Sequence, residues 1–331
     1  MLTLGPHRLC NLVALAPMAG VTDVPFRQLA WRLGVGYMVG EMTGSRPELA
    51  QTRKTLLRRE AVAGALHAVQ IAGTEELWIA DATRQAIEQG AAVVDINFGC
   101  PAKKVCRKAA GSALMAQPQR LLELTKSALD AAEGSDAVVT VKMRTGPDPQ
   151  NRNAVDLALR LQDAGIQGLA IHGRTRADKF NGFAEFDTIA QVVAELDIAV
   201  FANGDIATPD DARRVLAHTN ADAVMIGRAA LGAPWLPTWV AQELAGRDYK
   251  LPDFSQRLEW LMEQLLATHS FYGEQQGVRI ARKHIQWTLR HQTLELLEPL
   301  NCEHLARSLV RADSASEQID LLSQAFEQRA A

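Results

Sequence analysis

The chain has 331 residues, of which 47% are hydrophobic and 22% charged, and its formal net charge is −3. This composition is typical of a globular protein with a sizeable core, and the length predicts one large domain and a smaller one. The slightly acidic balance argues mildly against nucleic-acid binding, which would require local basic patches.

The sequence favours a cytoplasmic protein. No apolar run reaches the roughly 18 residues that span a bilayer, and the first residues lack the pattern of a secretory signal. The four cysteines, Cys10, Cys100, Cys106 and Cys302, form no CxxC pair and no Cys/His ligand spacing. We therefore expect no bound metal, no iron–sulfur cluster and no disulfide framework.

Short apolar runs rich in β-branched residues recur along the first two thirds of the chain, with helical patterns between them. There are eight such runs, at residues 12–20, 37–43, 67–73, 91–101, 137–146, 168–175, 198–206 and 221–231. Nearly continuous hydrophobicity is typical of parallel strands that are buried on both faces. Eight strand–helix units predict a (β/α)₈ TIM barrel over residues 1–244. An open, doubly wound sheet is the alternative, although no GxGxxG phosphate loop follows the first run.

Glycine and proline residues mark the expected ends of the other elements. Helices at 75–90 and 154–165 are each expected to end on a glycine, and Pro118, Pro209 and Pro234 are expected to mark helix starts. Gly5 and Pro6 predict the turn of a small hairpin that plugs the floor of the barrel.

The pattern changes after residue 245, because only helical periodicity remains. Amphipathic helices are expected at 257–273, 279–292 and 314–328. We therefore predict a second, all-helical domain over residues 245–331.

Polar or reactive side chains follow nearly every predicted strand. In chain order they are Pro17 with Met18, Glu41, Gln70, Asn97 with Cys100, Lys142 with Arg144, His172 with Arg174, Asn203 with Asp205, and Gly227 with Arg228. The carboxyl ends of barrel strands meet at one face, where TIM-barrel active sites lie. The sequence therefore predicts an active site at this face.

The predicted site suits a ligand that combines a phosphate with a flat ring. The glycines of "ANGDI" and "MIGRAAL" follow the last two strands, where barrels often hold a phosphate, and Arg228 can pair with it. Gln70, Asn97 and Lys142 can offer donors and acceptors to a heteroaromatic ring, and FMN has both parts. Lys142 taken alone could instead form a Schiff base, as in aldolases.

Several motifs resemble those of the tRNA-dihydrouridine synthases, and CPAKKV and RIARKHI are most similar to the bacterial B-type members. The motifs are APMAGVTDVPFR, VQIAG, DINFGCPAKKV, VKMRTG, IHGRTR, NGDI, MIGRAAL and GVRIARKHIQW, and they cover nearly the whole chain. The resemblance implies an FMN-containing barrel followed by a helical tRNA-binding domain. It also implies NADPH or NADH as reductant and a D-loop uridine, at the seventeenth nucleotide, as the target.

The resemblance further implies individual roles. It places Cys100 as the proton donor and assigns the FMN contacts to Ala16, Pro17, Met18, Gln70, Lys142, His172, Asn203, Gly204, Asp205, Gly227 and Arg228. In the implied reaction a hydride is delivered to C6 of a uracil ring, and Cys100 then protonates C5. Asn97, Lys142 and Arg144 are the candidates to stabilise the developing enolate charge.

Two basic runs are candidate contacts for RNA. One includes Lys103, Lys104, Arg107, Lys108 and Arg120, and the other includes Arg279, Arg282, Lys283 and Arg290. The residues expected to contact tRNA are Asn97, Lys103, Lys104, Arg144, Arg174, Arg279, Arg282 and Lys283. No obligate protein partner is expected.

Two rival functions stay open. The first is an FMN-dependent barrel oxidoreductase that acts on a free pyrimidine-like metabolite, which would not need the helical domain. The second is an RNA-binding protein derived from a barrel and without catalysis, which would not need Cys100, Lys142 or the phosphate loops.

Overall fold

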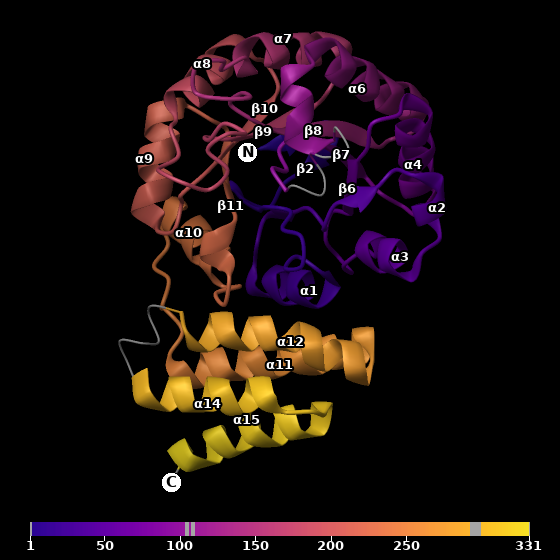
Figure 1. Ribbon diagram of the computed structural model, residues 1–331. Helices are drawn as coiled ribbons and strands as arrows, with labels where there is room; N and C mark the ends of the chain where they lie inside the picture. Colours follow the sequence, from indigo (N-terminus) through magenta and orange to yellow (C-terminus); the bar gives the residue numbers. More distant parts are fainter. Residues whose placement is uncertain (1, 103–105, 107–109, 292–298, 331) are drawn as a thin grey trace.

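The computed structural model describes residues 2–102, 106, 110–291 and 299–330. Figure 1 shows a ring of strands enclosed by helices, with a layer of further helices beside it. The strands of the ring are β3 (Val13–Leu15), β4 (Tyr37–Met38), β5 (Thr43–Gly44), β6 (Ala68–Ala72), β7 (Val93–Asn97), β8 (Val138–Arg144), β9 (Gly168–His172), β10 (Ala199–Asn203) and β11 (Ala223–Ile226). They pair in parallel in the order β4-β3-β11-β10-β9-β8-β7-β6-β5.

The second predicted strand is split into two short pieces, and these close the ring. β4 pairs with β3, while β5 pairs with β6. Between the two pieces, the amide of Val39 donates to the carbonyl of Leu15 (3.4 Å) and the amide of Gly40 donates to the carbonyl of Ala68 (3.3 Å). All eight predicted strand regions are therefore present, and the predicted (β/α)₈ barrel is confirmed against the open-sheet alternative.

Helices cover the outside of the barrel. They are α1 (Val24–Leu33), α2 (Pro47–Ala50), α3 (Arg53–Arg59), α4 (Glu76–Glu88), α6 (Pro118–Ala132), α7 (Ala154–Ala164), α8 (Asp187–Glu195), α9 (Pro209–Thr219) and α10 (Leu236–Leu244), with 3₁₀ turns η1 (Gly111–Ala116) and η2 (Arg228–Ala230). Pro118 and Pro209 begin helices as predicted. The prediction for Pro234 was wrong, because α10 begins at Leu236 and it is Pro237 that occupies its first turn.

A short hairpin lies at the amino-terminal ends of the barrel strands, as predicted. β1 (Thr3–Leu4) pairs with β2 (His7–Arg8), and Gly5 turns the chain with φ +55°. Leu4 is fully buried against Gly168 at the start of β9, where an added Cβ would lie 2.4 Å from the Leu4 side chain. The hairpin therefore fills the barrel floor and leaves the opposite end for a site.

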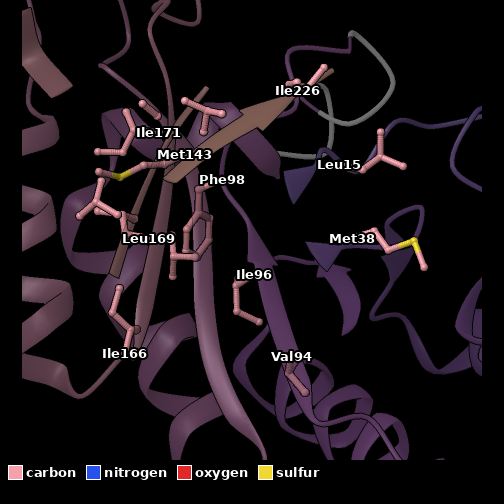
Figure 2. Packing of buried hydrophobic residues seen from close by; sticks show 14 of the residues in the cluster. Leu15, Met38, Val94, Ile96, Phe98, Met143, Ile166, Leu169, Ile171 and Ile226 are labelled. Carbon is pink, nitrogen blue, oxygen red and sulfur yellow. The ribbon is translucent and has the colours of Figure 1, made fainter. Parts of the chain in front are cut away.

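Successive strand residues alternate between the two sides of the barrel wall. Figure 2 shows outward-facing strand side chains, such as Val94 and Ile96 of β7 and Leu169 and Ile171 of β9, which belong to the core shared with the surrounding helices. The alternate residues face the barrel interior. Near the floor they are apolar, as Val93 is, whereas towards the carboxyl ends they become polar. As a result, the polar side chains that face the barrel interior gather at the carboxyl ends of the strands.

The last part of the chain is helical, as predicted. Its helices are α11 (Phe254–Tyr272), α12 (Glu274–Leu289), α14 (Pro299–Arg311) and α15 (Ala315–Ala330). We did not predict α14 from the sequence. Pro299, followed by apolar residues at helical spacing, could have indicated it. Figure 1 shows α11 and α12 on the side of this layer that faces α1 of the barrel. Arg32 of α1 pairs with Glu263 of α11, and the two parts are therefore in direct contact.

Candidate active site

A pocket of about 830 Å³ opens at the carboxyl ends of the barrel strands. All of the predicted cofactor contacts line it, namely Ala16, Pro17, Met18, Gln70, Lys142, His172, Asn203, Gly204, Asp205, Gly227 and Arg228. Asn97, Cys100 and Arg144 line it as well. The structure therefore brings together side chains from seven of the predicted strand regions, and a volume of this size suits a ligand as large as a dinucleotide or a flavin.

A buried carboxylate organises the inner wall of the pocket. Asp95 of β7 accepts hydrogen bonds from the Gln70 amide (2.6 Å) and the Thr140 hydroxyl (2.7 Å). Gln70 in turn accepts from the Asn97 amide (2.8 Å). Burial raises the pKa of Asp95, although these hydrogen bonds oppose the shift. The sequence analysis did not single out Asp95, although an acid within the apolar run VVDI was the available signal.

The loop that carries Cys100 is fixed from both sides. The Asn97 side-chain oxygen accepts from the amides of Gly99 (3.2 Å) and Cys100 (2.9 Å). The Cys100 carbonyl accepts from the Ser112 hydroxyl (2.9 Å), and the Gly99 carbonyl accepts from the Arg144 guanidinium (2.7 Å). The asparagine of the motif therefore orients the cysteine directly, which is a geometric reason for their spacing of three residues.

Cys100 is a half-buried thiol at the pocket wall. Burial raises its pKa above the ordinary value of 9.0 and the neighbouring Cys106 adds to the rise, whereas Arg144 and Lys142 act in the opposite direction. The thiol is therefore protonated near neutral pH. A protonated, partly accessible thiol can donate a proton to a ligand in the pocket.

Lys142 supplies a cation to the same wall. Its ammonium group donates to the Asn203 side chain (2.9 Å), which donates to the Met225 carbonyl (2.7 Å). Burial, followed by repulsion from Arg144, lowers the pKa of Lys142 to about 8, while Asp95 opposes the shift. One ammonium donor is thus held by Asn203, and the others are left to meet a ligand.

The opposite wall is held by a buried arginine. Arg174, 2% exposed, makes a bidentate pair with Asp205 (2.7 and 2.9 Å), and it also donates to the carbonyls of Asn181 and Gly182. A further donor reaches the His172 ring (3.3 Å). This network occupies the Arg174 donors, so the geometry is at odds with the predicted contact between Arg174 and substrate. Arg174 instead supports Asp205 and the loop beside the pocket.

His172 is neutral in this setting. Burial and then the surrounding cations Lys142, Arg144, Arg174 and Arg228 lower its pKa to about 2. Because the ring nitrogen Nε2 faces an Arg174 donor, the hydrogen-bond pattern assigns the ring proton to Nδ1. His172 can therefore offer one N–H donor to a ligand.

The residues predicted to contact RNA differ in how accessible the structure leaves them. Arg144 is buried and donates to the carbonyls of Gly99, Thr175 and Lys179, so it ties two loops of the pocket together. Arg279 is exposed and has no ion-pair partner within the described ranges, whereas Arg282 donates to the Ala312 carbonyl (3.2 Å). The predictions for Lys103 and Lys104 lie outside the described residues.

Lys283 faces the barrel. An added Cβ at Gly20, in the loop before α1, would lie 3.5 Å from its ammonium nitrogen. Burial lowers the pKa of Lys283, whereas Asp23 and Glu41 raise it. The same Asp23 accepts from the Tyr272 hydroxyl (3.1 Å). Lys283 therefore lies where the helical layer meets the loop before α1, and this position favours a role in that contact over binding of an RNA phosphate.

Arg120, which belongs to the first predicted basic run, is paired with carboxylates in the structure. Its guanidinium pairs with Glu75, Glu76 and Glu123 on the flank of the barrel. Three carboxylates surround this charge, so Arg120 is less available to RNA phosphates than an unpaired cation. Glu75 and Glu76 come from the start of α4, far from Arg120 in the sequence, whereas Glu123 lies one turn further along α6.

The described part of the chain shows neither a metal cluster nor a membrane-spanning helix. Within the described ranges, no group of three or more His, Cys, Asp or Glu side chains is arranged to hold a metal ion. No helix in the described part of the chain is long and apolar enough to cross a membrane.

Two solved structures illustrate the similarity of the fold. The structure of the old yellow enzyme homologue from Zymomonas mobilis superposes with a TM-score of 0.54 at 15% identity, over 77% of this chain and 94% of that one. Histamine dehydrogenase from Rhizobium sp. 4-9 gives a TM-score of 0.55 at 12% identity, over 80% of this chain and half (50%) of that longer chain. At these identities the similarity shows the barrel fold alone.

Closer relatives are found by sequence. The protein named tRNA-dihydrouridine synthase B from Pseudomonas syringae pv. tomato is 48% identical over 288 residues, which cover 86% of this chain and 85% of that protein. The protein of the same name from Salmonella typhimurium is 42% identical over 327 residues, 98% of each chain. The model of the family described as "Dihydrouridine synthase" matches residues 14–327. With a match of this extent and relatives of this similarity, the chain belongs to the dihydrouridine synthase family.

Proposed function

We propose that this protein reduces the C5=C6 bond of a uridine in tRNA to dihydrouridine, with bound FMN and with NADPH or NADH as reductant. The target is a D-loop uridine, at the seventeenth nucleotide. One observation carries the proposal: a protonated thiol, Cys100, is fixed at the wall of a barrel pocket that is large enough for a flavin and a base. The membership of the chain in the dihydrouridine synthase family supports the choice of substrate.

The pocket fits FMN in both charge and shape. Gly204 and Gly227 lie beside Arg228, so backbone amides and a guanidinium can meet a phosphate on one side. Lys142, Gln70 and the N–H of His172 can meet the polar edge of a ring on the other side. A bound flavin supplies the hydride that the double bond takes up.

Cys100 supplies the proton in the proposed reaction. When hydride reaches C6 of the uracil ring, negative charge develops towards the C4 carbonyl and C5 requires a proton. The thiol sits on a loop held by Asn97 and Ser112, so its position does not have to be created during the reaction. The S–H bond breaks, a C–H bond forms at C5, and the thiolate takes its proton back from solvent.

Lys142 offsets the charge that develops on the uracil ring or the flavin. Lys142 on β8 is the register partner of Asn97 on β7, so the two side chains lie next to each other at the pocket wall. A preorganised cation in a site of low dielectric constant stabilises an enolate without rearranging solvent. The Schiff-base chemistry considered for Lys142 would leave Cys100 and the phosphate side of the pocket without a role.

The helical layer is proposed to contact the tRNA outside the pocket. Arg279 on α12 is exposed and has no ion-pair partner among the described residues, while Arg282 and Lys283 have protein partners nearby. A free metabolite would need no such surface, and this disfavours the small-molecule alternative. The reaction also requires tRNA and a reduced nicotinamide, so we propose a cytoplasmic location.

The purified protein is expected to be yellow and to hold FMN non-covalently, since glycine loops, Arg228 and Lys142 converge on one pocket. Absorbance of the isolated protein and release of FMN on denaturation check this directly. Arg228→Ala should reduce FMN retention because its guanidinium is replaced by an apolar group, whereas Arg213→Ala, on the outer helix α9, should not. A colourless protein that does not take up added FMN would contradict the proposal and would favour Schiff-base chemistry at Lys142.

Replacing Arg279 by alanine is expected to weaken tRNA binding and to reduce the slope of log Kd against log salt by about one phosphate contact. Lys283→Ala should change the salt slope less, because the amine lies close to Asp23 and Glu41. Filter binding over a salt series measures both. Equal slopes for Arg279→Ala and the parent protein would mean that this helix face is only solvated surface.

Mapping dihydrouridine in tRNA from cells that lack the gene tests the function itself. The seventeenth nucleotide should be unmodified uridine in those cells, and the parent gene should restore dihydrouridine. A gene encoding Cys100→Ala should restore little of it. Loss of dihydrouridine at another position would support the activity but reject the assigned site.

A further inference from the structure

A long loop forms one rim of the pocket. It comprises residues 173–186, between the end of β9 at His172 and the start of α8 at Asp187. Loops of this length without secondary structure are uncommon in compact domains and usually have a function. Phe180 and Lys179 of this loop line the pocket, so the loop lies at the entrance that a substrate must pass.

The tip of the loop is held rigidly. The buried Arg174 guanidinium donates to the carbonyls of Asn181 (3.1 Å) and Gly182 (2.7 Å). The amide of Ala184 donates to the Asp205 carboxylate (2.8 Å). The backbone is thus fixed on both sides of residue 183, and Asp205 itself lines the pocket.

Phe183 projects from this fixed backbone into solvent. Its side chain is 94% exposed, and the next most exposed large apolar side chain in the described part of the chain, Leu77, is 77% exposed. Single exposed apolar residues are common, but here the backbone is anchored on both sides of the exposed ring. The result is an aromatic surface that is preorganised beside the pocket entrance.

The loop that carries Phe183 also carries basic side chains, together with the acids Asp178 and Glu185. Lys179 is exposed and Arg176 is half-buried, and neither has an ion-pair partner within the described ranges. The neighbouring Phe180 ring lies 5.4 Å from the Arg144 guanidinium and 5.2 Å from that of Arg228. Aromatic faces between basic side chains are the combination that binds unpaired nucleotides, because the ring stacks on a base and the cations meet phosphates.

We propose that Phe183 stacks on an unpaired base of the tRNA next to the target uridine, while the uridine occupies the pocket and Lys179 meets the intervening phosphate. This inference rests on the proposed function. A target base must leave its stack to enter the pocket, and that leaves its neighbour without a stacking partner. Phe183 replaces that partner. One exposed ring is also far smaller than the area that a stable protein dimer buries, which favours a nucleotide over a second copy of the chain.

The experiment compares Phe183→Ala, Phe183→Trp and Phe183→Leu with Leu77→Ala, a matched loss of an exposed apolar side chain on α4, on the other side of the barrel (Figure 1). Phe183→Ala should raise the Kd for tRNA about 5- to 150-fold, the range for loss of one base–aromatic stack. The salt slope of Kd should not change, because no charge is removed. Phe183→Trp should restore tight binding, Phe183→Leu should restore it only in part, and Leu77→Ala should bind like the parent protein.

Flavin content, melting temperature and the rate of flavin reduction by NADPH should be the same in all these proteins. An unchanged Kd in Phe183→Ala would overturn the inference. So would slower reduction by NADPH with unchanged tRNA binding, since the ring would then serve the nicotinamide, and so would a dimer of the parent protein that Phe183→Ala dissociates. A parent protein that forms no dihydrouridine would reject the proposed function, whereas an active parent with an unaffected Phe183→Ala variant would reject this inference alone.

Discussion

Replacing Cys100 by alanine should slow the transfer of electrons from reduced flavin to tRNA by about 10²–10⁴-fold, the usual contribution of a general acid. The variant should fold, retain FMN and accept electrons from NADPH at the parent rate, because the thiol is not part of the core and the reductive step needs no proton at uracil C5. Rapid mixing of the reduced, anaerobic protein with tRNA, followed by flavin absorbance, measures the affected step.

Cys106→Ala is the matched control for this prediction. The Cys106 thiol approaches the Cys100 carbonyl at 3.5 Å, but the Ser112 hydroxyl and amide also donate to that carbonyl. The loop should therefore stay in place and the rate should change by only a few-fold. Lower flavin content and a lower melting temperature in Cys100→Ala, with a normal rate per bound flavin, would instead show a structural cysteine.

Lys142→Met should lower the same rate by about 10²–10³-fold, the cost of removing one preorganised donor from a developing oxyanion. The pKa of Lys142 is lowered to about 8, so its positive charge is complete below that pH and is lost as the pH rises through it. The rate of flavin oxidation by tRNA should accordingly be level near neutral pH and should fall above about pH 8. Cys100 does not cause this fall, because its raised pKa keeps the thiol protonated over the same range.

A pH profile for Lys142→Arg identifies the group responsible. Arginine keeps its charge at all accessible pH values, so the fall should move to higher pH even if the rate is lower throughout. Lys142→Met should show no fall near pH 8. If all three proteins lose activity at the same pH, another group controls the reaction and the role of Lys142 is wrong.

The strand alternation explains why most of the pocket could be predicted from the sequence. Each parallel strand is apolar on its outer face, and the first polar residues at its carboxyl end must point inwards, as Gln70, Lys142 and Asn203 do. A sequence pattern contains this information, because the period and the end of the strand are both local. The motif from Asn97 to Cys100 is likewise local, since the asparagine accepts from the cysteine amide.

Long-range partners could not be predicted in the same way. Arg174 looked available to a substrate, but residues 181, 182 and 205 occupy its donors, and only the fold brings these together. Lys283 looked like a phosphate contact until the packing of α12 placed it beside the loop at Gly20. Asp95 was missed because one acid in an apolar run becomes informative only when neighbouring strands supply Gln70 and Thr140.

Anaerobic mixing of the NADPH-reduced protein with unmodified tRNA tests the central claim most directly. We predict that tRNA reoxidises the flavin and that one uridine per flavin gains the mass of two hydrogen atoms, while free uridine at the same concentration has little effect. Reoxidation by a free pyrimidine but not by tRNA would contradict it and would identify a small-molecule reductase on the same barrel.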